Sequence, residues 1–232
     1  MAYVREFEKA TEYIMGKIRG GSLTLGSGIP SERQISAELG ISRNSVREGL
    51  RALENMGVIE SRHGSGNYVS GHISDSVKRT FEVMFMLQKV TMKEIADYRR
   101  GMALAVFEMA FGNPHKNKEL RRLSELLDGF LEQPLEERIR RDSEFHCTLV
   151  KMANNRILSM VMSSISEAHT QWVRQVLAAM PENGMRQLDE AHRKIFESLV
   201  HNDKSAGMAA IAEHYFIIEM MADDFQQKSA ER

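Results

Sequence analysis

The order of local signals between residues 30 and 69 constrains this chain more than any other feature, because it fixes a helix, a turn and a second helix. Ser31 and Gln34 have the spacing of a capping box at the start of the first helix. Gly40 supplies the left-handed residue that ends this helix, and Ser42 caps the next one. Two short helices joined by a glycine-containing turn of this length predict a helix-turn-helix.

The pattern changes after Gly57, where helical spacing gives way to short β-type runs. Residues 58–62 and 67–69 are typical of strands, and residues 63–66 supply a turn between them. The amphipathic segment 3–19 provides a third helix that can close a small core. The first part of the chain is therefore predicted to be a winged helix-turn-helix.

The second helix of this motif carries Arg43, Arg47 and Arg51 on one stripe, because they are four residues apart. Its apolar residues form a neighbouring stripe with the spacing of a packed helix face. Exposed guanidinium groups at the N-terminal turn of a recognition helix can bind phosphates and guanine edges in the major groove of DNA. A solvated charged face is the alternative interpretation, since Glu48 and Glu54 lie nearby.

The stretch IPSERQISAELGISRNSVREGLRALENMGVIESRHGSGNYV closely resembles the winged-helix domain of GntR-family bacterial transcription regulators. Three motifs carry the resemblance: P-S-E-R at the first helix, S-R-x-S-V-R-E-x-L in the second, and R-x-G-S-G-x-Y-V in the wing. The resemblance implies that several residues contact DNA. They are Arg33, Arg43 and Arg47 at phosphates and guanine edges, Ser42, Asn44 and Ser45 at the helix N-terminus, and His63 and Gly64 in the minor groove.

The composition is that of an ordinary globular protein, since 42% of the 232 residues are hydrophobic and 27% are charged. The net charge of −1 means that a DNA-binding function has to rest on where the arginines lie, not on total charge. No apolar run approaches the roughly 20 residues needed to cross a bilayer, so no membrane partner is expected. A single cysteine, Cys147, excludes an internal disulfide framework and favours a cytoplasmic protein.

Beyond the wing the sequence has helical patterns and no strand patterns, so the predicted fold class is mostly α. We predict a winged helix-turn-helix DNA-binding domain at 1–70, a linker at 71–75, and an all-α effector-binding and dimerisation domain at 76–232. Within the last part, a capping box at Thr91 and Glu94 opens a long helix. Six or seven helices of about 15–25 residues are expected to form an antiparallel bundle around its own core.

Four residues of the helical part have the side chains of a metal site. Asp142 and His146 are four apart and share one helix face, and His192 and His214 lie in two later helices. Three imidazoles and a carboxylate from three helices could bind a divalent transition metal, such as zinc, nickel or manganese, and leave coordination positions open. Scattered, partly exposed helix residues are the alternative interpretation, because only the i, i+4 pair is a spacing signal.

The same residues fall in the motifs of a known domain. The order D-x-x-x-H, then H-R-x-I, then a final E-H resembles the all-helical effector domain (FCD) of the fatty-acid-regulator branch of GntR proteins. The resemblance implies that Asp142, His146, His192 and His214 are metal ligands. It also implies that the chain senses a small organic acid and dimerises to bind palindromic operators.

Arg99 matches an arginine that commonly holds the carboxylate of the effector in that branch. The chain departs from the usual pattern four positions later, where it has Ala103 in place of a glutamate, with Gly101 in between. These changes alter the shape and polarity of the expected pocket. The identity of the effector therefore cannot be carried over from the resemblance.

These interpretations predict a cytoplasmic, homodimeric transcription regulator, not an enzyme, that binds palindromic double-stranded operator DNA. Its helical domain is expected to bind a divalent metal ion and a small carboxylate effector. Two alternatives stay open. A helical metal-dependent enzyme could carry a DNA-binding head, although the motifs provide no general base beyond the ligands. A metal sensor would respond to the ion itself, without an organic ligand.

Overall fold

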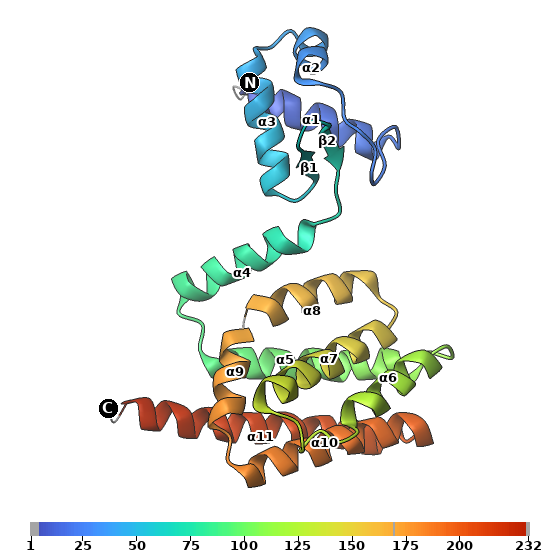
Figure 1. Ribbon diagram of the computed structural model, residues 1–232, viewed down its shortest axis with the longest axis vertical. Helices are drawn as coiled ribbons and strands as arrows, with labels where there is room; N and C mark the ends of the chain where they lie inside the picture. The colour runs from blue at the N-terminus through green and yellow to red at the C-terminus, as the bar shows by residue number, and fades with distance from the viewer. Residues whose placement is uncertain (1–4, 169, 231–232) are drawn as a thin grey trace. The chain divides into compact units, whose positions relative to one another are not determined.

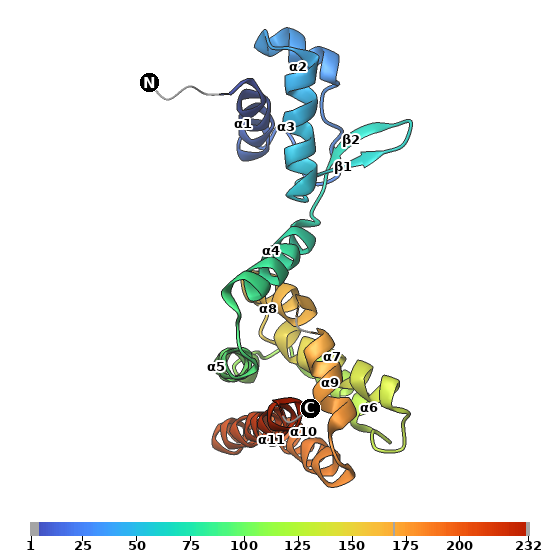
Figure 2. The same ribbon diagram turned by 90° about the vertical axis from the view of Figure 1, so that its left-hand side faces the viewer.

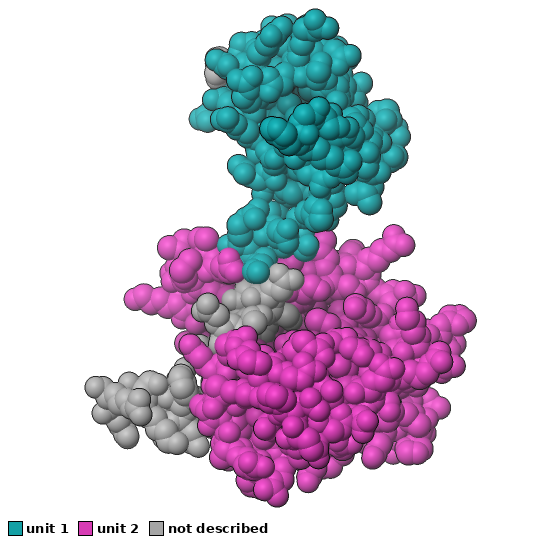
Figure 3. Space-filling view, in the orientation of Figure 1, with its two compact units in different colours: residues 1–80 teal, residues 81–232 magenta. Residues whose placement is uncertain are grey.

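The computed structural model describes the backbone of residues 5–168 and 170–230 and most of their side chains. Within these residues the chain has eleven helices and one two-stranded antiparallel sheet, so the predicted mostly α fold is confirmed (Figure 1). The chain divides into two compact units, Met1–Thr80 and Phe81–Arg232, which Figure 3 shows in different colours. Helix α4 (Ile73–Gln88) begins inside the segment predicted as a linker, and the division between the units falls within this helix.

The first unit is a winged helix-turn-helix (Figure 2). Its elements in chain order are α1 (Glu6–Arg19), α2 (Glu32–Leu39), α3 (Arg43–Asn55), β1 (Ile59–Arg62) and β2 (Gly66–Val69). The start that the sequence predicts for the first helix, at Tyr3, lies outside the described residues. The first strand begins one residue later than predicted, because the backbone N–H of Val58 donates to the carbonyl of Leu53 and closes the end of α3.

The turn between α2 and α3 is built from the capping residues that the sequence identifies. The backbone N–H of Ser31 donates to Gln34 Oε1 at 2.8 Å, which forms one half of the capping box. Gly40 has a φ of 65°, the left-handed conformation that ends α2. The hydroxyl oxygen of Ser42 accepts a hydrogen bond from the backbone N–H of Ser45 at 3.0 Å and starts α3. These bonds fix where one helix stops and the recognition helix begins.

The core of this unit lies where α1 packs against α3. Ala10, Val46 and Leu53 have no exposed surface. Gly49 allows the two helices to approach closely, since a Cβ at this position would lie 2.7 Å from the carbonyl oxygen of Phe7. A larger residue at this position would push α3 away from α1 and displace the recognition helix.

The second unit is all-α within the residues that the structure describes. Besides the end of α4, its helices are α5 (Met92–Phe111), α6 (Asn117–Leu127), α7 (Leu135–Met152), α8 (Arg156–Ala168), α9 (Thr170–Ala179), α10 (Glu182–His201) and α11 (Lys204–Ala230). The described chain thus has eight helices after the wing, where the sequence predicts six or seven. Helix α6 has 11 residues and is shorter than predicted. Apolar periodicity locates a helix better than it locates its ends. None of the described helices combines the length and apolar character that crossing a membrane requires.

Two local features bring together the helices that carry the predicted metal ligands. Helices α10 and α11 are joined by a tight turn in which Asn202 has a φ of 54°. Gly207 on α11 lies so close to α5 that a Cβ would be 2.0 Å from the ring of Phe107. Helices α5, α7, α10 and α11 share one apolar cluster, to which Phe107, Phe145 and Leu199 contribute. These packed helices form the frame of the site.

Candidate functional site

The predicted DNA-contacting residues of the first unit lie on α2, on the N-terminal part of α3 and on the wing (Figure 1). Arg33, Arg43, Asn44 and Arg47 all have exposed side chains. Among the residues that the structure describes, Arg33 and Arg43 have no hydrogen-bond or ion-pair partner. Their guanidinium groups are therefore open to an anion such as a phosphate.

Arg47 differs from the other two arginines because it is already paired within the protein. Its Nε and Nη2 atoms donate to the two carboxylate oxygens of Glu32 at 3.1 and 2.8 Å, a bidentate arrangement that joins α3 to α2. The hydrogen bond from Arg47 holds the pKa of Glu32 below its ordinary value. DNA that uses Arg47 must therefore share the guanidinium with this carboxylate or displace it.

Ser42 and Ser45 use their hydroxyl groups inside the protein. The two hydroxyl oxygens lie 2.8 Å apart, and the Ser45 hydroxyl donates to Glu6 Oε2 at 2.8 Å, which connects the start of α3 to α1. These bonds orient the N-terminus of the recognition helix. A DNA contact at these two positions has to use backbone N–H groups or the remaining acceptor capacity of the hydroxyl oxygens.

His63 and Gly64 form the exposed turn of the wing, as predicted. Gly64 has a φ of 70°, a conformation that favours glycine. The base of the turn is held by Arg62, whose guanidinium carbon lies 4.2 Å from the ring centroid of Tyr68 while its Nε donates to Glu60 at 2.8 Å. This pair of contacts stiffens the hairpin that presents His63.

The four predicted metal ligands of the second unit converge on one point. One donor atom from each of Asp142, His146, His192 and His214 lies within 4.8 Å of all the others. The ring centroids of His192 and His214 are 4.6 Å apart, and Asp142 Oδ1 lies 3.5 Å from His192 Nε2 and 3.9 Å from His146 Nε2. Two ligands come from α7, one from α10 and one from α11, so three helices meet at this point.

Burial makes this cluster unusual. Asp142, His192 and His214 have 4%, 1% and 2% of their surfaces exposed. Burial raises the pKa of Asp142 to about 6 and lowers the pKa of His192 to about 3. Burial also holds the pKa of His214 well below its ordinary value, with the neighbouring His192 and His146 as further causes. Both imidazoles are therefore neutral at physiological pH, which is the state that ligates a metal.

The hydrogen bonding of these groups tests whether a metal fits. The Nε2 atom of His192 and both ring nitrogens of His214 are buried and have no hydrogen-bond partner among the described residues. Such groups are costly to bury unless something satisfies them. An ion at the centre of the cluster would satisfy one nitrogen of each ring, and three imidazoles with one carboxylate suit zinc, nickel or manganese. The residues present therefore fit a divalent transition metal.

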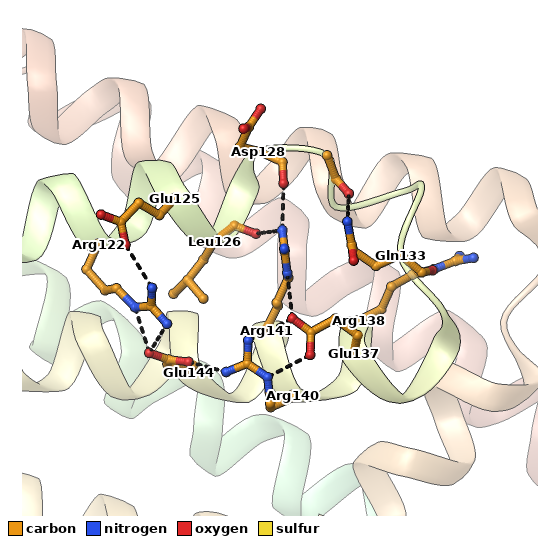
Figure 4. A network of polar contacts seen from close by, with 11 residues as sticks. Arg122, Glu125, Leu126, Asp128, Gln133, Glu137, Arg138, Arg140, Arg141 and Glu144 are labelled. Carbon is orange, nitrogen blue, oxygen red and sulfur yellow. Dashed lines mark hydrogen bonds and ion pairs between the residues drawn. The ribbon is translucent and has the colours of Figure 1, made fainter.

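Helix α7, which carries Asp142 and His146, is fixed by a polar network on its outer side (Figure 4). Arg141 donates to the carbonyl oxygen of Asp128 at 2.6 Å and to Glu137 at 2.9 Å. Arg140 links Glu137 to Glu144 along the same helix, and hydrogen bonds from Arg140 and Arg141 lower the pKa of Glu137 to about 2. Further bonds from Arg122 join α6 to this network. The rotation of α7 about its axis is thereby set, and so is the direction of its two ligands.

Arg99 on α5 lies between two small cavities next to the metal-ligand cluster. The α8 cavity, of about 30 Å³, is bounded by α5, α7, α8, α10 and α11, and the α9 cavity, of about 10 Å³, by α5, α7, α9 and α11. Arg99, His146, His214 and Tyr215 line both cavities. An anion in either cavity could therefore contact the Arg99 guanidinium and would also lie next to any metal ion that the cluster held.

Tyr215 and Phe130 also belong to this site, although no motif in the sequence identifies them. Tyr215 is buried, and the guanidinium carbon of Arg99 lies 5.9 Å from its ring centroid. Burial raises the pKa of Tyr215, and the Arg99 guanidinium opposes this shift. Phe130, in the connection after α6, places its ring edge-on at 6.4 Å from His192. Only the position of Tyr215 directly after His214 could have marked it as a neighbour of the site.

Two family comparisons cover most of the chain. Residues 7–69 match the family described as bacterial regulatory proteins, gntR family, and residues 94–216 match the FCD domain. The first match spans the winged helix-turn-helix. The second spans the helices that carry Arg99 and all four predicted ligands.

Similar proteins are also regulators. The chain is 22% identical over 219 residues to the HTH-type transcriptional regulator LutR of Bacillus subtilis (strain 168), a match that covers 92% of this chain and 100% of LutR. It is 23% identical over 233 residues to the Glc operon transcriptional activator of Escherichia coli (strain K12), covering 94% of this chain and 89% of that protein. The solved structure of Streptococcus agalactiae GntR matches with a TM-score of 0.63 at 19% identity, over 91% of this chain and 98% of that one. The structural match supports the fold.

Proposed function

The chain belongs to the gntR family of bacterial regulatory proteins and is a DNA-binding transcription regulator with an FCD effector domain, and on this premise we propose that its helical unit binds a divalent metal ion and a small carboxylate that together modulate operator binding. The alternative of a metal-dependent enzyme has no support from the similar proteins, which are regulators. The metal, the carboxylate and the contacts with DNA make up the proposal.

The convergence of four donor atoms within 4.8 Å is the observation that carries the metal part of the proposal. Chance placement of helix residues would not bring three imidazoles and a carboxylate to one point, with Asp142, His192 and His214 buried. A bound ion would supply a positive centre with open coordination positions for an anion. His192 and His214 would hold it as neutral ligands, and Asp142 as the ionised one.

Arg99 is the residue that we assign to the carboxylate. It lines both cavities beside the cluster, and its guanidinium suits a carboxylate because it can donate two parallel hydrogen bonds. Burial strengthens this interaction, since little water competes for the anion inside a small cavity. A carboxylate held between Arg99 and the metal would connect α5 to α7, α10 and α11.

We further propose that the protein acts in the cytoplasm as a homodimer on a palindromic operator. One winged head reads only a half-site, and two heads about one helical turn apart are needed for tight binding. Arg33, Arg43 and Arg47 are assigned to phosphates and guanine edges, with Asn44 and the backbone at Ser42 and Ser45 at the start of the recognition helix. His63 and Gly64 are assigned to the minor groove.

Metal content and effector response test this proposal in one preparation. Protein purified without chelators is examined by native mass spectrometry for bound zinc, nickel or manganese, and its affinity for an operator selected from random DNA is measured with and without small carboxylates. We expect one metal ion per chain and a carboxylate-dependent change in operator affinity. Protein that takes up none of the three metals and shows no thermal shift with any of them would contradict the metal site.

A matched pair of variants separates the roles of two neighbouring arginines. Arg99→Ala should keep the metal and lose most of the response to carboxylate. Arg100→Ala should keep both, because Arg100 pairs with Asp97 at 3.2 Å and does not line either cavity. If operator affinity follows metal concentration in the complete absence of organic acids, the protein is a metal sensor and the carboxylate part of the proposal is wrong.

A further inference from the structure

The two cavities beside the cluster share one polar end and differ in the walls beyond it. One stripe of α5 shows this division, because Ala96, Arg99, Ala103 and Val106 recur with the spacing of one helix face. Ala96 lines the α9 cavity, Arg99 lines both, and Ala103 and Val106 line the α8 cavity. The Arg99 guanidinium thus lies where the two cavities meet. The α9 cavity lies toward Ala96 and the α8 cavity toward Ala103 and Val106.

The α8 cavity is the one with room for a ligand tail. Its volume is about 30 Å³, against about 10 Å³ for the α9 cavity. A cavity of roughly 10–15 Å³ on this scale holds a single water molecule. The α9 cavity can therefore take little more than a water, whereas the α8 cavity has space for a tail of a few atoms.

The wall of the α8 cavity beyond its polar end is hydrocarbon. Val106, Leu149, Ile195 and Ile211 line it and are at most 5% exposed. The remaining polar lining is limited to Cys147 on α7 and Ser163 on α8. A hydroxyl or a second carboxylate at the end of a tail would lose its water there and gain few partners. Apart from Arg99, no lysine or arginine of the described chain lines this cavity.

We infer that the effector is a monocarboxylate with a short hydrocarbon tail, and that the α8 cavity selects it against acids that carry a polar group at the far end of the tail. This inference rests on the proposed function, in which Arg99 and the metal hold the carboxylate. Ala103 is its specificity-determining position, because the methyl group of this residue leaves the space next to Arg99 that the tail occupies.

Three acids with the same four-carbon chain test the polarity of the cavity. Butyrate ends in a methyl group, 4-hydroxybutyrate in a hydroxyl group and succinate in a second carboxylate. The measurement is the thermal shift of metal-loaded full-length protein against ligand concentration, with operator release as a second readout. Butyrate should bind best, and the other two should be roughly tenfold weaker or more, since burial of an unpartnered polar group is costly. From acetate through propionate to butyrate, affinity should rise by about fourfold per methylene.

Substitutions that change the volume of the α8 cavity should move the preferred chain length in opposite directions. Ala103→Leu fills the space, so the preference should shift to acetate or propionate. Val106→Ala enlarges it, so pentanoate or hexanoate should gain relative to butyrate. Ala96→Leu is the matched control on the same stripe, and it should leave the order of the acids unchanged. Metal-induced stabilisation shows which variants are folded, and Val106→Ala alone keeps the test valid if the larger side chains disturb packing.

The outcomes separate this inference from the function on which it rests. If metal-loaded protein responds to none of these acids but operator affinity changes with other small carboxylates, only this inference is wrong. If it responds to no small carboxylate at all, the carboxylate part of the proposed function fails together with this inference. If 4-hydroxybutyrate or succinate binds as tightly as butyrate, or if Val106→Ala leaves the preferred length unchanged, only the inference about the tail is wrong. Tighter binding of butyrate together with a shift in preferred length in Val106→Ala supports it.

Discussion

The proposed DNA-binding surface and the proposed metal-ligand cluster both depend on ionisable side chains, but these side chains lie in opposite surroundings. Arg33 and Arg43 lie in solvent on α2 and α3, where water and salt screen each charge. Asp142 and His192 lie among apolar side chains, where burial shifts the pKa of the carboxyl group up and the pKa of the imidazole down. The first site presents charges that are already formed, whereas the second contains buried ring nitrogens that have no hydrogen-bond partner among the described residues.

This difference predicts how each site should respond to substitution. On the exposed surface, each contact contributes a small and separable amount to DNA binding, because phosphate contacts act through counterion release. In the buried cluster, the four proposed ligands would share one ion, so the loss of one ligand should affect the binding by all the others. Effects should be large and collective in the second unit, and small and graded in the first.

The largest effect is expected from His192→Ala. The side chain is fully enclosed and comes from a different helix than the other ligands, so its loss should remove both metal binding and the effector response. At a metal concentration of about 100 times the dissociation constant, wild type should gain about 2.7 kcal/mol of stability, and the variant almost none. Melting curves with and without metal measure this difference.

The control for this prediction is His201→Ala, an exposed histidine on the same helix α10. It should keep the full metal-induced stabilisation. Equal stabilisation of both variants by metal would mean that the buried cluster does not bind the ion.

The next effect is the dependence of metal binding on pH. In metal-free protein, the pKa of Asp142 is raised from 3.8 to about 6, so the folded state holds this proton more tightly and its contribution to stability falls as pH rises from about 4 to 6. The pKa of His192 is lowered from 6.5 to about 3, so its contribution rises with pH through that window and is lost as pH falls. His192 therefore stays neutral in the folded protein, and of these two residues Asp142 is the one at which protons compete with metal.

Metal-induced stabilisation should consequently decline below pH 6, by about 1.4 kcal/mol per pH unit while the metal concentration stays well above its apparent dissociation constant. Asp142→Asn should bind metal more weakly at pH 7 but show little further decline between pH 7 and 5. Calorimetric titration of metal at several pH values measures both slopes. A decline that persists unchanged in Asp142→Asn would assign the competing proton to a histidine instead.

Local signals explain how much of this fold the sequence could predict. The capping box at Ser31, the left-handed Gly40 and the cap at Ser42 each act within a few residues, so the helix-turn-helix follows from spacing alone. The comparisons confirm the family resemblance. The resemblance added the expectation that the wing contacts the minor groove. The exact helix count of the second unit was not accessible, because a short helix such as α6, whose N-cap residue is Lys116, has no side-chain cap and so no distinct capping signal in the sequence.

Residue spacing alone could predict the metal-ligand cluster only in part, and the family resemblance was needed to name all four residues. Asp142 and His146 share a turn of α7, but the arrival of His192 and His214 depends on the turn at Asn202 and on the close approach at Gly207. Such long-range packing leaves no periodicity in the sequence. The pairing of Arg47 with Glu32 was missed for the same reason, because the two residues are on different helices.

A smaller effect is expected from the exposed arginines. Arg43→Ala should relax operator specificity at one base position by about 1–3 kcal/mol if it contacts a guanine edge. Arg47→Ala should instead weaken binding to all sequences and lower the salt slope by about one unit if it contacts a phosphate. Binding titrations against operator variants at several salt concentrations distinguish these roles. Wild-type affinity and salt slope in both variants would show that DNA docks elsewhere on the first unit.

The smallest effect, and the one that acts in the opposite direction, is expected from Glu32→Gln. In the free protein the Glu32 carboxylate accepts two hydrogen bonds from Arg47, and DNA has to compete with it. Removing the negative charge should release the guanidinium and tighten DNA binding by up to about fivefold, since exposed ion pairs contribute at most about 1 kcal/mol. The salt slope should become steeper, because one more cation is free to neutralise a phosphate.

Two comparisons decide whether this gain comes from Arg47. Glu48→Gln makes the same change in net charge on α3 without touching the pair, so it should give the smaller gain that reduced repulsion alone produces. In an Arg47→Ala background, Glu32→Gln should add no more than Glu48→Gln does. If Glu32→Gln weakens binding instead, the carboxylate positions Arg47 for the operator, and the exposed surface shares with the buried cluster a dependence on preorganised partners.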